Sequence, residues 1–319
     1  MATTPADNAG RETDTAAAVV LARLVSQIND SAASKQGLQL AGGGTKHFLN
    51  PPSAAPRLSL ADYVGIIAYQ PSELVIEVRA GTRLDVIEHT LAVQGQRLAF
   101  EPPRFGPAST IGGVVSAGLS GPARPYAGAL RDHVLGVTLL DAHGRLQRFG
   151  GRVMKNVAGY DVSRLAAGAW GTLGPVAELA LRVAPRSSAE ASIAWSMTPV
   201  DALRRMTELA RTAWPLNGAC FDDGVLRVRL AGSLPAVEEA VLALAPERVE
   251  ADAGFWQELR DCRLPFFADA TPLWRLAVPP ATPSLNLSGR MLLDWGGAQR
   301  WLKSELPAAQ IQAAARAVG

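Results

Sequence analysis

The sequence has few cysteines, and this scarcity excludes several kinds of site. Only two occur among its 319 residues, Cys220 and Cys262, and they stand apart without C-x-x-C spacing. A chain with this pattern is not expected to hold an iron–sulfur cluster or a zinc ion of its own, because iron–sulfur clusters and zinc sites of the C-x-x-C type need clustered thiolate ligands. Isolated thiols also suit a reducing compartment.

Long apolar runs and an excess of one charge are missing too. No apolar run approaches the roughly 20 residues needed to cross a bilayer, and residues 1–15 lack the apolar region of a signal peptide. The formal net charge is +2, carried by scattered Lys and Arg, which does not favour nucleic-acid binding. The length favours two domains. We expect a soluble, cytoplasmic protein, at most peripherally attached to a membrane.

Glycine is concentrated in two stretches. Residues 110–121 read T-I-G-G-V-V-S-A-G-L-S-G, and residues 40–46 read L-A-G-G-G-T-K after a short apolar strand. Glycine costs backbone entropy but lets main-chain N–H groups approach a ligand closely. The two stretches together indicate an anionic ligand held from two sides, such as a dinucleotide pyrophosphate. Either stretch taken alone could equally be a tight turn.

The first half of the chain alternates short strands and helices. Apolar spacing predicts a helix over residues 16–28, a β-hairpin from 63–69 and 73–79, and a helix beginning at 81–82. Further strands are predicted at 97–100, 133–141, 145–149 and 175–183, and a boundary at 184–188. The first glycine stretch leads into paired prolines rather than a helix, so it is not a Rossmann turn.

The second half changes in style. Helices are predicted over 199–211 and 234–244, with strands at 193–196 and 225–230, followed by an aromatic region from Trp256 to Trp301. This order is typical of an α+β domain. Its aromatic residues could form either the core of that domain or a surface on which a partner docks.

Several motifs, in order, resemble the FAD-binding domain of the vanillyl-alcohol oxidase and p-cresol methylhydroxylase (PCMH) type. They are G-G-G-T-K at 42–46, Y-x-P-x-x-L-x-I-x-V-x-A-G-T at 69–82, T-I-G-G at 110–113, R-D-H-V-L-G-V at 131–137, K-N-V-A-G-Y-D at 155–161 and G-T-L-G at 171–174. Within that family, W-Q-E-L-R at 256–260, L-P-F-F at 264–267 and L-D-W-G-G-A-Q-R-W-L at 293–302 resemble the flavin-binding subunits of bacterial glycolate oxidase complexes.

The resemblance implies an α+β fold. After a disordered segment at 1–15, a PCMH-type FAD-binding domain would span 16–186, with subdomains of about 16–82 and 83–186. An α+β cap domain would span 187–319. Relatives return from the cap to the FAD domain in a closing segment that this sequence does not show, so we expect that segment to be absent.

The resemblance also implies which residues bind FAD. The pyrophosphate would be held by the two glycine stretches, the adenosine end by the G-T-L-G strand, and the flavin or its ribityl chain by the segment around 155–160. The residues are Gly42, Gly43, Gly44, Thr45, Lys46, Pro102, Thr110, Ile111, Gly112, Gly113, Ala117, Gly118, Gly121, Lys155, Asn156, Gly159, Tyr160, Gly171, Thr172 and Val176. Lys155 could instead be an ordinary solvated residue. Relatives with covalent flavin often carry His directly after the first glycines, where this chain has Thr45, so we expect non-covalent FAD and no metal.

The implied activity is oxidation of glycolate, or another 2-hydroxy acid, to glyoxylate within a complex. Electrons would pass from the flavin to an iron–sulfur subunit, and a catalytic flavoprotein subunit would be a second partner. The chemistry needs a base near the hydroxyl proton, but no histidine follows His143. His133 could be that base or a structural strand-edge residue, so the catalytic residues stay unknown. The alternatives are an assembly subunit without turnover, and a reductase of the enolpyruvyl-UDP-sugar type.

Overall fold

The chain divides into two compact units. The computed structural model describes residues 5–49, 53–151, 160–250 and 254–318. The first unit contains Met1–Leu119 and Ala129–Arg186, and the second contains Ser120–Gly128 and Ser187–Gly319. The sequence predicted one contiguous domain over 16–186, whereas in the structure residues 120–128 belong with the second unit. The division of the first unit into subdomains at about residue 82 stays a prediction.

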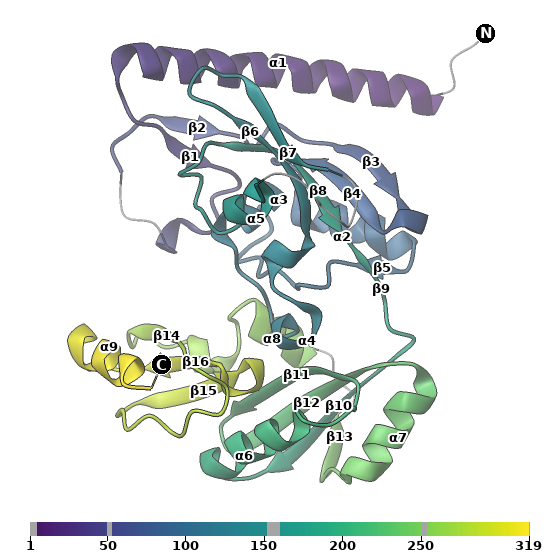
Figure 1. The fold of residues 1–319 in the computed structure, drawn as a ribbon, viewed down its shortest axis with the longest axis vertical. Coiled ribbons are helices and arrows are strands. Elements are labelled where there is room, and N and C mark those ends of the chain that lie inside the picture. Colours follow the sequence, from purple (N-terminus) through teal and green to yellow (C-terminus); the bar gives the residue numbers. More distant parts are fainter. Residues whose placement is uncertain (1–4, 50–52, 152–159, 251–253, 319) are drawn as a thin grey trace. The chain divides into compact units, whose positions relative to one another are not determined.

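A five-stranded sheet forms the centre of the first unit (Figure 1). Its order is β3 (Ile66–Gln70), β4 (Val75–Arg79), β8 (Val176–Arg182), β6 (Val134–Leu140) and β7 (Leu146–Gly150), with every neighbour antiparallel. The predicted hairpin is present as β3 and β4, joined by the short 3-10 helix η2 (Pro71–Glu73). The alternation of apolar residues was sufficient to predict it, because successive side chains of a strand point to opposite faces.

Helices and two small sheets complete this unit. The helices are α1 (Pro5–Ser34), α2 (Leu84–Val93), α3 (Ile111–Ala117) and α5 (Val162–Ala166), with 3-10 helices η1 (His47–Leu49) and η3 (Leu130–His133). β1 (Gln39–Ala41) pairs in parallel with β2 (Arg57–Ser59), and β5 (Gln96–Arg97) pairs antiparallel with β9 (Ala184–Pro185).

The first helix is longer than predicted. It begins at Pro5, whereas the sequence predicted disorder up to residue 15. Asp14, within the segment expected to be disordered, accepts a hydrogen bond from Arg79 Nη2 at 2.7 Å. Leu24 and Ile28 of α1 are buried in the core of the unit, so tertiary contacts support a helix whose early residues show little apolar pattern.

The second unit is built on a seven-stranded antiparallel sheet. Its order is β13 (Arg248–Glu250), β10 (Ala189–Ser196), β12 (Val225–Gly232), β11 (Leu216–Asp222), β15 (Arg290–Asp294), β16 (Gln299–Lys303) and β14 (Leu273–Ala277). The sequence predicted β10 and β12 in shorter form but not the other five strands, β11 and β13 to β16. The remaining elements are α4 (Arg124–Ala127), α6 (Pro199–Leu209), α7 (Leu234–Leu244), α8 (Gly254–Arg260), η4 (Pro265–Phe267), η5 (Trp295–Gly297) and α9 (Ala308–Arg316).

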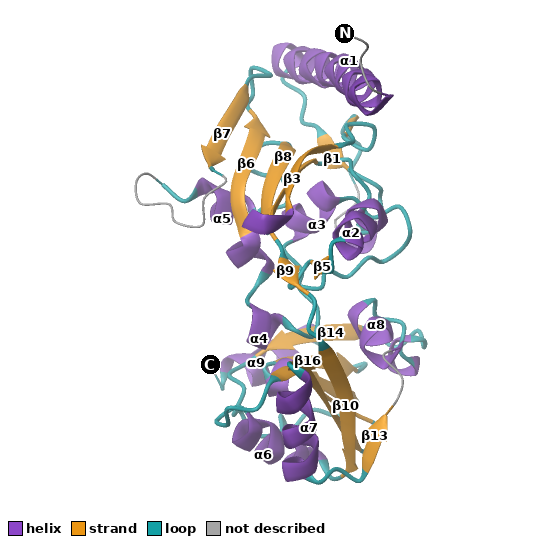
Figure 2. Cartoon of the chain, turned by 90° about the vertical axis from the view of Figure 1, so that its right-hand side faces the viewer, coloured by secondary structure: helices purple, strands orange, loops and turns teal. Residues whose placement is uncertain are grey.

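The strands of this sheet bury both faces. Phe221 and Leu293 are cross-strand partners and pack with α6 and α7, whereas the preceding residues, Cys220 and Leu292, pack with Trp256 of α8. Figure 2 accordingly shows α6 and α7 on one face of the sheet and α8 on the other. Trp256 and Trp295 are buried. The aromatic region is therefore mainly core, and the expected docking face is not formed by these two tryptophans.

None of the helices described here has the length and apolar character required to cross a membrane.

Candidate cofactor cleft

The first glycine stretch follows β1 and turns tightly against the segment that precedes α3. A Cβ atom on Gly43 would lie 1.5 Å from the carbonyl oxygen of Ala108, and one on Gly42 would lie 2.3 Å from Thr110 Oγ1. Gly44 has φ +75°, a left-handed conformation that favours glycine. These glycines are therefore needed first for the close approach of two segments far apart in sequence.

The second glycine stretch is a helix in its first half, not a loop. Thr110 is the N-cap of α3, and Gly118 ends the helix with φ +66°. The N–H of Ile111 donates to the carbonyl oxygen of Thr82 at 3.0 Å, and that of Gly112 donates to Ala80 at 2.8 Å. These two amides are already hydrogen-bonded within the protein. The expectation that amides 110–113 as a group bind a pyrophosphate must therefore be corrected.

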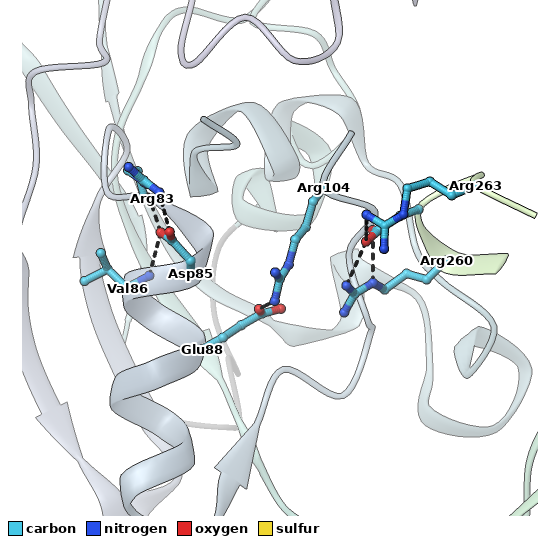
Figure 3. A network of polar contacts seen from close by, with 8 residues as sticks. Arg83, Asp85, Val86, Glu88, Arg104, Arg260 and Arg263 are labelled. Carbon is cyan, nitrogen blue, oxygen red and sulfur yellow. Dashed lines mark hydrogen bonds and ion pairs between the residues drawn. The ribbon is translucent and has the colours of Figure 1, made fainter. Parts of the chain in front are cut away.

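Helix α2 fixes the segment that leads into α3. The N–H of Leu84 donates to the carbonyl oxygen of Ser109 at 2.8 Å, and Arg104 forms an ion pair with Glu88 of α2 (Figure 3). At the start of the helix, Asp85 accepts a hydrogen bond from Arg83 Nε at 3.0 Å, and the bonds from Arg83 lower the pKa of that carboxyl group. The segment that leads into the second glycine stretch is thus held in place by contacts with Leu84 and Glu88 of α2.

The two glycine stretches and the turn before β8 surround one cleft. Counting space open to solvent, it encloses about 840 Å³. Ten of the predicted residues line it: Gly42, Gly43, Gly44, Thr45, Lys46, Thr110, Gly112, Gly113, Gly171 and Val176.

Nine further residues line the same cleft without having been predicted: Gln39, Leu40, Ala41, His47, Leu60, Ala80, Ser116, Trp170 and Pro175. Most of them flank a predicted residue in sequence, so extending each motif by a few positions would have found them. Ala80 lies within the family motif at 69–82, whereas Leu60 carries no such signal, because it reaches the cleft only through tertiary folding.

Lys46 brings a positive charge into the lining of this cleft. Its side chain is buried, and its ammonium group donates to Ser109 Oγ at 3.1 Å and to Thr45 Oγ1 at 3.3 Å. The ammonium nitrogen also lies 5.7 Å from the centroid of the Phe105 ring. These hydroxyl and aromatic contacts orient the lysine, so its ammonium group has a defined place beside the cleft.

The other predicted residues that the structure describes lie outside this lining. Ile111 is fully buried in the core, and a Cβ on Gly118 would lie 2.7 Å from Gly168 Cα, so both serve packing. The Thr172 hydroxyl donates to the carbonyl oxygen of Ala169 at 2.7 Å. Pro102 and Ala117 are buried, and Tyr160 is exposed.

Gly121 belongs to the second unit, where its carbonyl oxygen accepts a hydrogen bond from Trp295 Nε1 at 2.9 Å. Lys155, Asn156 and Gly159 lie outside the described residues.

His133 is buried against the core of the first unit. The residue is 3 % exposed, its ring centroid lies 5.4 Å from that of Phe100, and it does not line the cleft. A general base must come within hydrogen-bond reach of the proton that it removes. This position suits the structural alternative for His133 better than the catalytic one.

Comparison with known proteins identifies the class of this fold. A family described as "FAD binding domain" matches residues 16–150. Among solved structures, alkyldihydroxyacetonephosphate synthase is similar in fold, with a TM-score of 0.67 at 12 % identity, covering 92 % of this chain and 71 % of that one. The chain is thus an FAD-binding flavoprotein with the PCMH-type α+β fold, as the sequence predicted.

The curated relatives define the family more narrowly. The chain is 42 % identical to glycolate oxidase subunit GlcE of Escherichia coli over 296 residues, which cover 93 % of this chain and 84 % of that protein. It therefore belongs to the GlcE family of FAD-dependent oxidoreductases, and its cofactor is FAD.

Two other relatives match only part of this chain. Glycolate oxidase subunit GlcD of Bacillus subtilis is 33 % identical over 139 residues, covering 43 % of this chain and 29 % of that protein. D-lactate dehydrogenase of Anaerostipes hadrus is 30 % identical over 128 residues, covering 40 % and 26 %. Each match spans less than a third of the relative's length, so it relates only part of this chain to part of that protein.

Proposed function

We propose that this chain is the FAD-binding subunit of a multisubunit glycolate oxidase, which oxidises glycolate to glyoxylate and passes electrons to an iron–sulfur subunit. The observation that carries the proposal is a cleft bordered by bare main chain, hydroxyl groups and a buried lysine in a chain that matches GlcE over most of its length. A catalytic flavoprotein subunit is the second proposed partner.

The chemistry of the cleft fits FAD. Bound FAD supplies the two-electron acceptor for oxidation of an alcohol carbon. In this proposal Gly42 to Gly44 allow close approach of the pyrophosphate, while Lys46 and the hydroxyl of Thr110 favour its negative charge. Gly171 and Val176 contact the adenosine end. We propose that FAD is held without a covalent bond, because Thr45 stands where relatives with covalent flavin often carry His.

The proposed division of labour follows from the lack of a histidine in the second unit. The sequence has no histidine from residue 187 onward, and His133 is buried against Phe100. Loss of a general base typically costs about 10²–10⁴-fold in rate. We therefore expect glycolate oxidation only in the assembled complex, with the base contributed by a partner.

Flavin content of the purified chain tests the cofactor part of this proposal. Lys46→Gln should weaken FAD binding about tenfold or more, because a hydrogen bond to a charged group contributes about 1.5–3 kcal/mol. Lys35→Gln, at an exposed lysine of the same unit, is the matched control. Flavin that stays on the polypeptide after acid precipitation would contradict non-covalent binding, and equal affinity in both variants would contradict the assignment of Lys46.

The second candidate is a subunit that retains FAD for assembly but takes no part in turnover, and the histidine-free second unit favours it. Reconstitution of the complex with Lys46→Gln separates the two. If glycolate oxidation falls in proportion to the FAD bound by this chain, the flavin is part of the reaction. If a complex with this cleft emptied keeps full activity, the assembly role is correct.

A further inference from the structure

Two arginines stack on a single tryptophan in the second unit. The guanidinium carbon of Arg124, on α4, lies 4.4 Å from the centroid of the Trp295 ring, and that of Arg275, on β14, lies 5.1 Å from it. The indole itself is held rigidly, since Trp295 Nε1 donates to Gly121 and its main-chain N–H donates to Asp294 Oδ1 at 2.7 Å. The two guanidinium groups can therefore be no farther apart than the sum of those two distances.

This pair differs from other stacked arginines of the unit. Three arginines that also stack on aromatic rings form ion pairs with carboxylates: Arg205 with Glu208, Arg227 with Glu250, and Arg290 with Asp269. Within the described part of the chain, Arg124 and Arg275 form no such ion pair. Arg275 Nε donates instead to the neutral Gln299 Oε1 at 2.7 Å.

The nearby carboxylate of Asp294 is engaged elsewhere. It is buried, and besides Trp295 it accepts a hydrogen bond from Gln299 Nε2 at 3.2 Å. The side chains of Arg124 and Arg275 both reach solvent. Desolvation lowers the pKa of Arg275, and the charge of Arg124 lowers it further. Two like charges thus stack on one indole at an accessible surface, while the carboxylate of Asp294, whose charge raises the pKa of Arg275, is itself buried.

We propose that Arg124 and Arg275 bind the carboxylate of a small organic acid, with Trp295 fixing the position of both guanidinium groups. The planar fork of a guanidinium matches the geometry of a carboxylate, and stacking on the indole reduces the side-chain freedom that binding would otherwise remove. A bound carboxylate also relieves the repulsion between the two arginines. The choice of a 2-hydroxy acid among small carboxylates rests on the proposed function, whereas the anion site itself does not.

Titration of the full chain with glycolate, followed by calorimetry or ligand-observed NMR, tests this site. Glycolamide, a neutral analogue, serves as the ligand control. Arg124→Gln and Arg275→Gln should each weaken glycolate binding about tenfold. Arg211→Gln, at an exposed arginine of the same unit, should bind as the unmodified chain does. Glycolamide should bind to none of these proteins.

Lysine variants and stability measurements keep the test independent of folding. Arg124→Lys and Arg275→Lys retain the charge but lose the fork, and they should bind with intermediate affinity at an unchanged unfolding midpoint. Equal glycolate affinity in all variants, equal binding of glycolamide, or no glycolate binding by the unmodified chain would each overturn the site. The titrations are performed with and without FAD, so binding without FAD supports the site even where the proposed function fails. Full glycolate oxidation by a complex carrying both Gln substitutions would overturn the choice of the 2-hydroxy acid substrate as the ligand and leave the proposed function standing.

Discussion

The main chain at Gly43 lies so close to Ala108 that a single methyl group at position 43 would overlap the carbonyl oxygen of Ala108. Gly43 belongs to the first glycine stretch and Ala108 lies just before the second, and both stretches border the cofactor cleft. The cleft therefore depends on a contact between two stretches of backbone before any ligand is considered. This relationship separates glycines that are needed for packing from glycines that are needed for a ligand.

Gly43→Ala should destabilise the chain by about 1–3 kcal/mol, because the added atom forces a backbone shift. Gly37→Ala is the matched control, since a Cβ there would have no atom within 4 Å. The unfolding midpoint in urea measures the difference. If both variants unfold at the same denaturant concentration, the close approach of the two segments is wrong.

Gly112→Val and Gly113→Val should behave differently although the positions are adjacent. A Cβ on Gly112 would lie 2.6 Å from Ala80 Cβ, so valine there should lower the unfolding midpoint as well as FAD content. A Cβ on Gly113 would meet only Thr110 Oγ1, at 3.3 Å. Valine at 113 should change the free energy of unfolding by no more than about 1 kcal/mol, but the variant should lose FAD. Unchanged FAD affinity at position 113 would remove that glycine from the binding site.

Arg300→Met should destabilise the second unit by about 2–4 kcal/mol, because it leaves three carbonyl groups, two of them on buried residues, without this donor. The Arg300 side chain is fully buried and donates to the carbonyl oxygens of Gly297 at 3.2 Å, Pro283 at 2.7 Å, and Thr282. Arg316→Met, at an exposed position of α9, is the control. A loss below about 1 kcal/mol in urea unfolding would show that these carbonyls find other partners.

Asp269 should make the stability of the fold fall as the pH is lowered into the acid range. Hydrogen bonds from Thr271, with a smaller effect of Lys303, lower its pKa from 3.8 to about 2. Because the pKa is lower in the folded state, the contribution is present above pH 3.8 and is lost as pH falls toward 2. Asp269→Asn should therefore flatten the decline of the urea midpoint across this interval. An identical decline in the variant would show that another group is responsible.

Local pattern was enough to predict much of the fold. Alternating residues at 73–79 and the apolar run at 175–183 became β4 and β8, and the helix predicted at 234–244 has those bounds in the structure. The family resemblance supplied the fold class and FAD. Local pattern could not predict the conformation of each glycine stretch or what it contacts. A high frequency of glycine indicates that something approaches the backbone closely, but it does not say whether this is a ligand or another segment of the chain.

Long-range contacts account for most other differences. Nothing near Gly121 indicates that it belongs with Trp295, which follows it by 174 residues. The hydrogen bond from the Gly112 N–H to the carbonyl oxygen of Ala80 could not be predicted from the sequence either, because it depends on how α3 lies beside the end of β4. Residues 120–128 were accordingly predicted to lie in the wrong unit.

Because residues 120–128 belong to the second unit, cleavage of a single peptide bond cannot divide the chain into its two units. The chain passes from one unit to the other after Leu119, returns after Gly128, and crosses again after Arg186. A protease that nicks the chain at residue 186 would leave α4 attached to the amino-terminal fragment but packed within the carboxy-terminal one. The nicked protein should therefore stay associated through a gel-filtration column. A fragment expressed from residue 187 onward would lack Arg124 and the acceptor of the Trp295 indole, so it would be an incomplete domain rather than an isolated one.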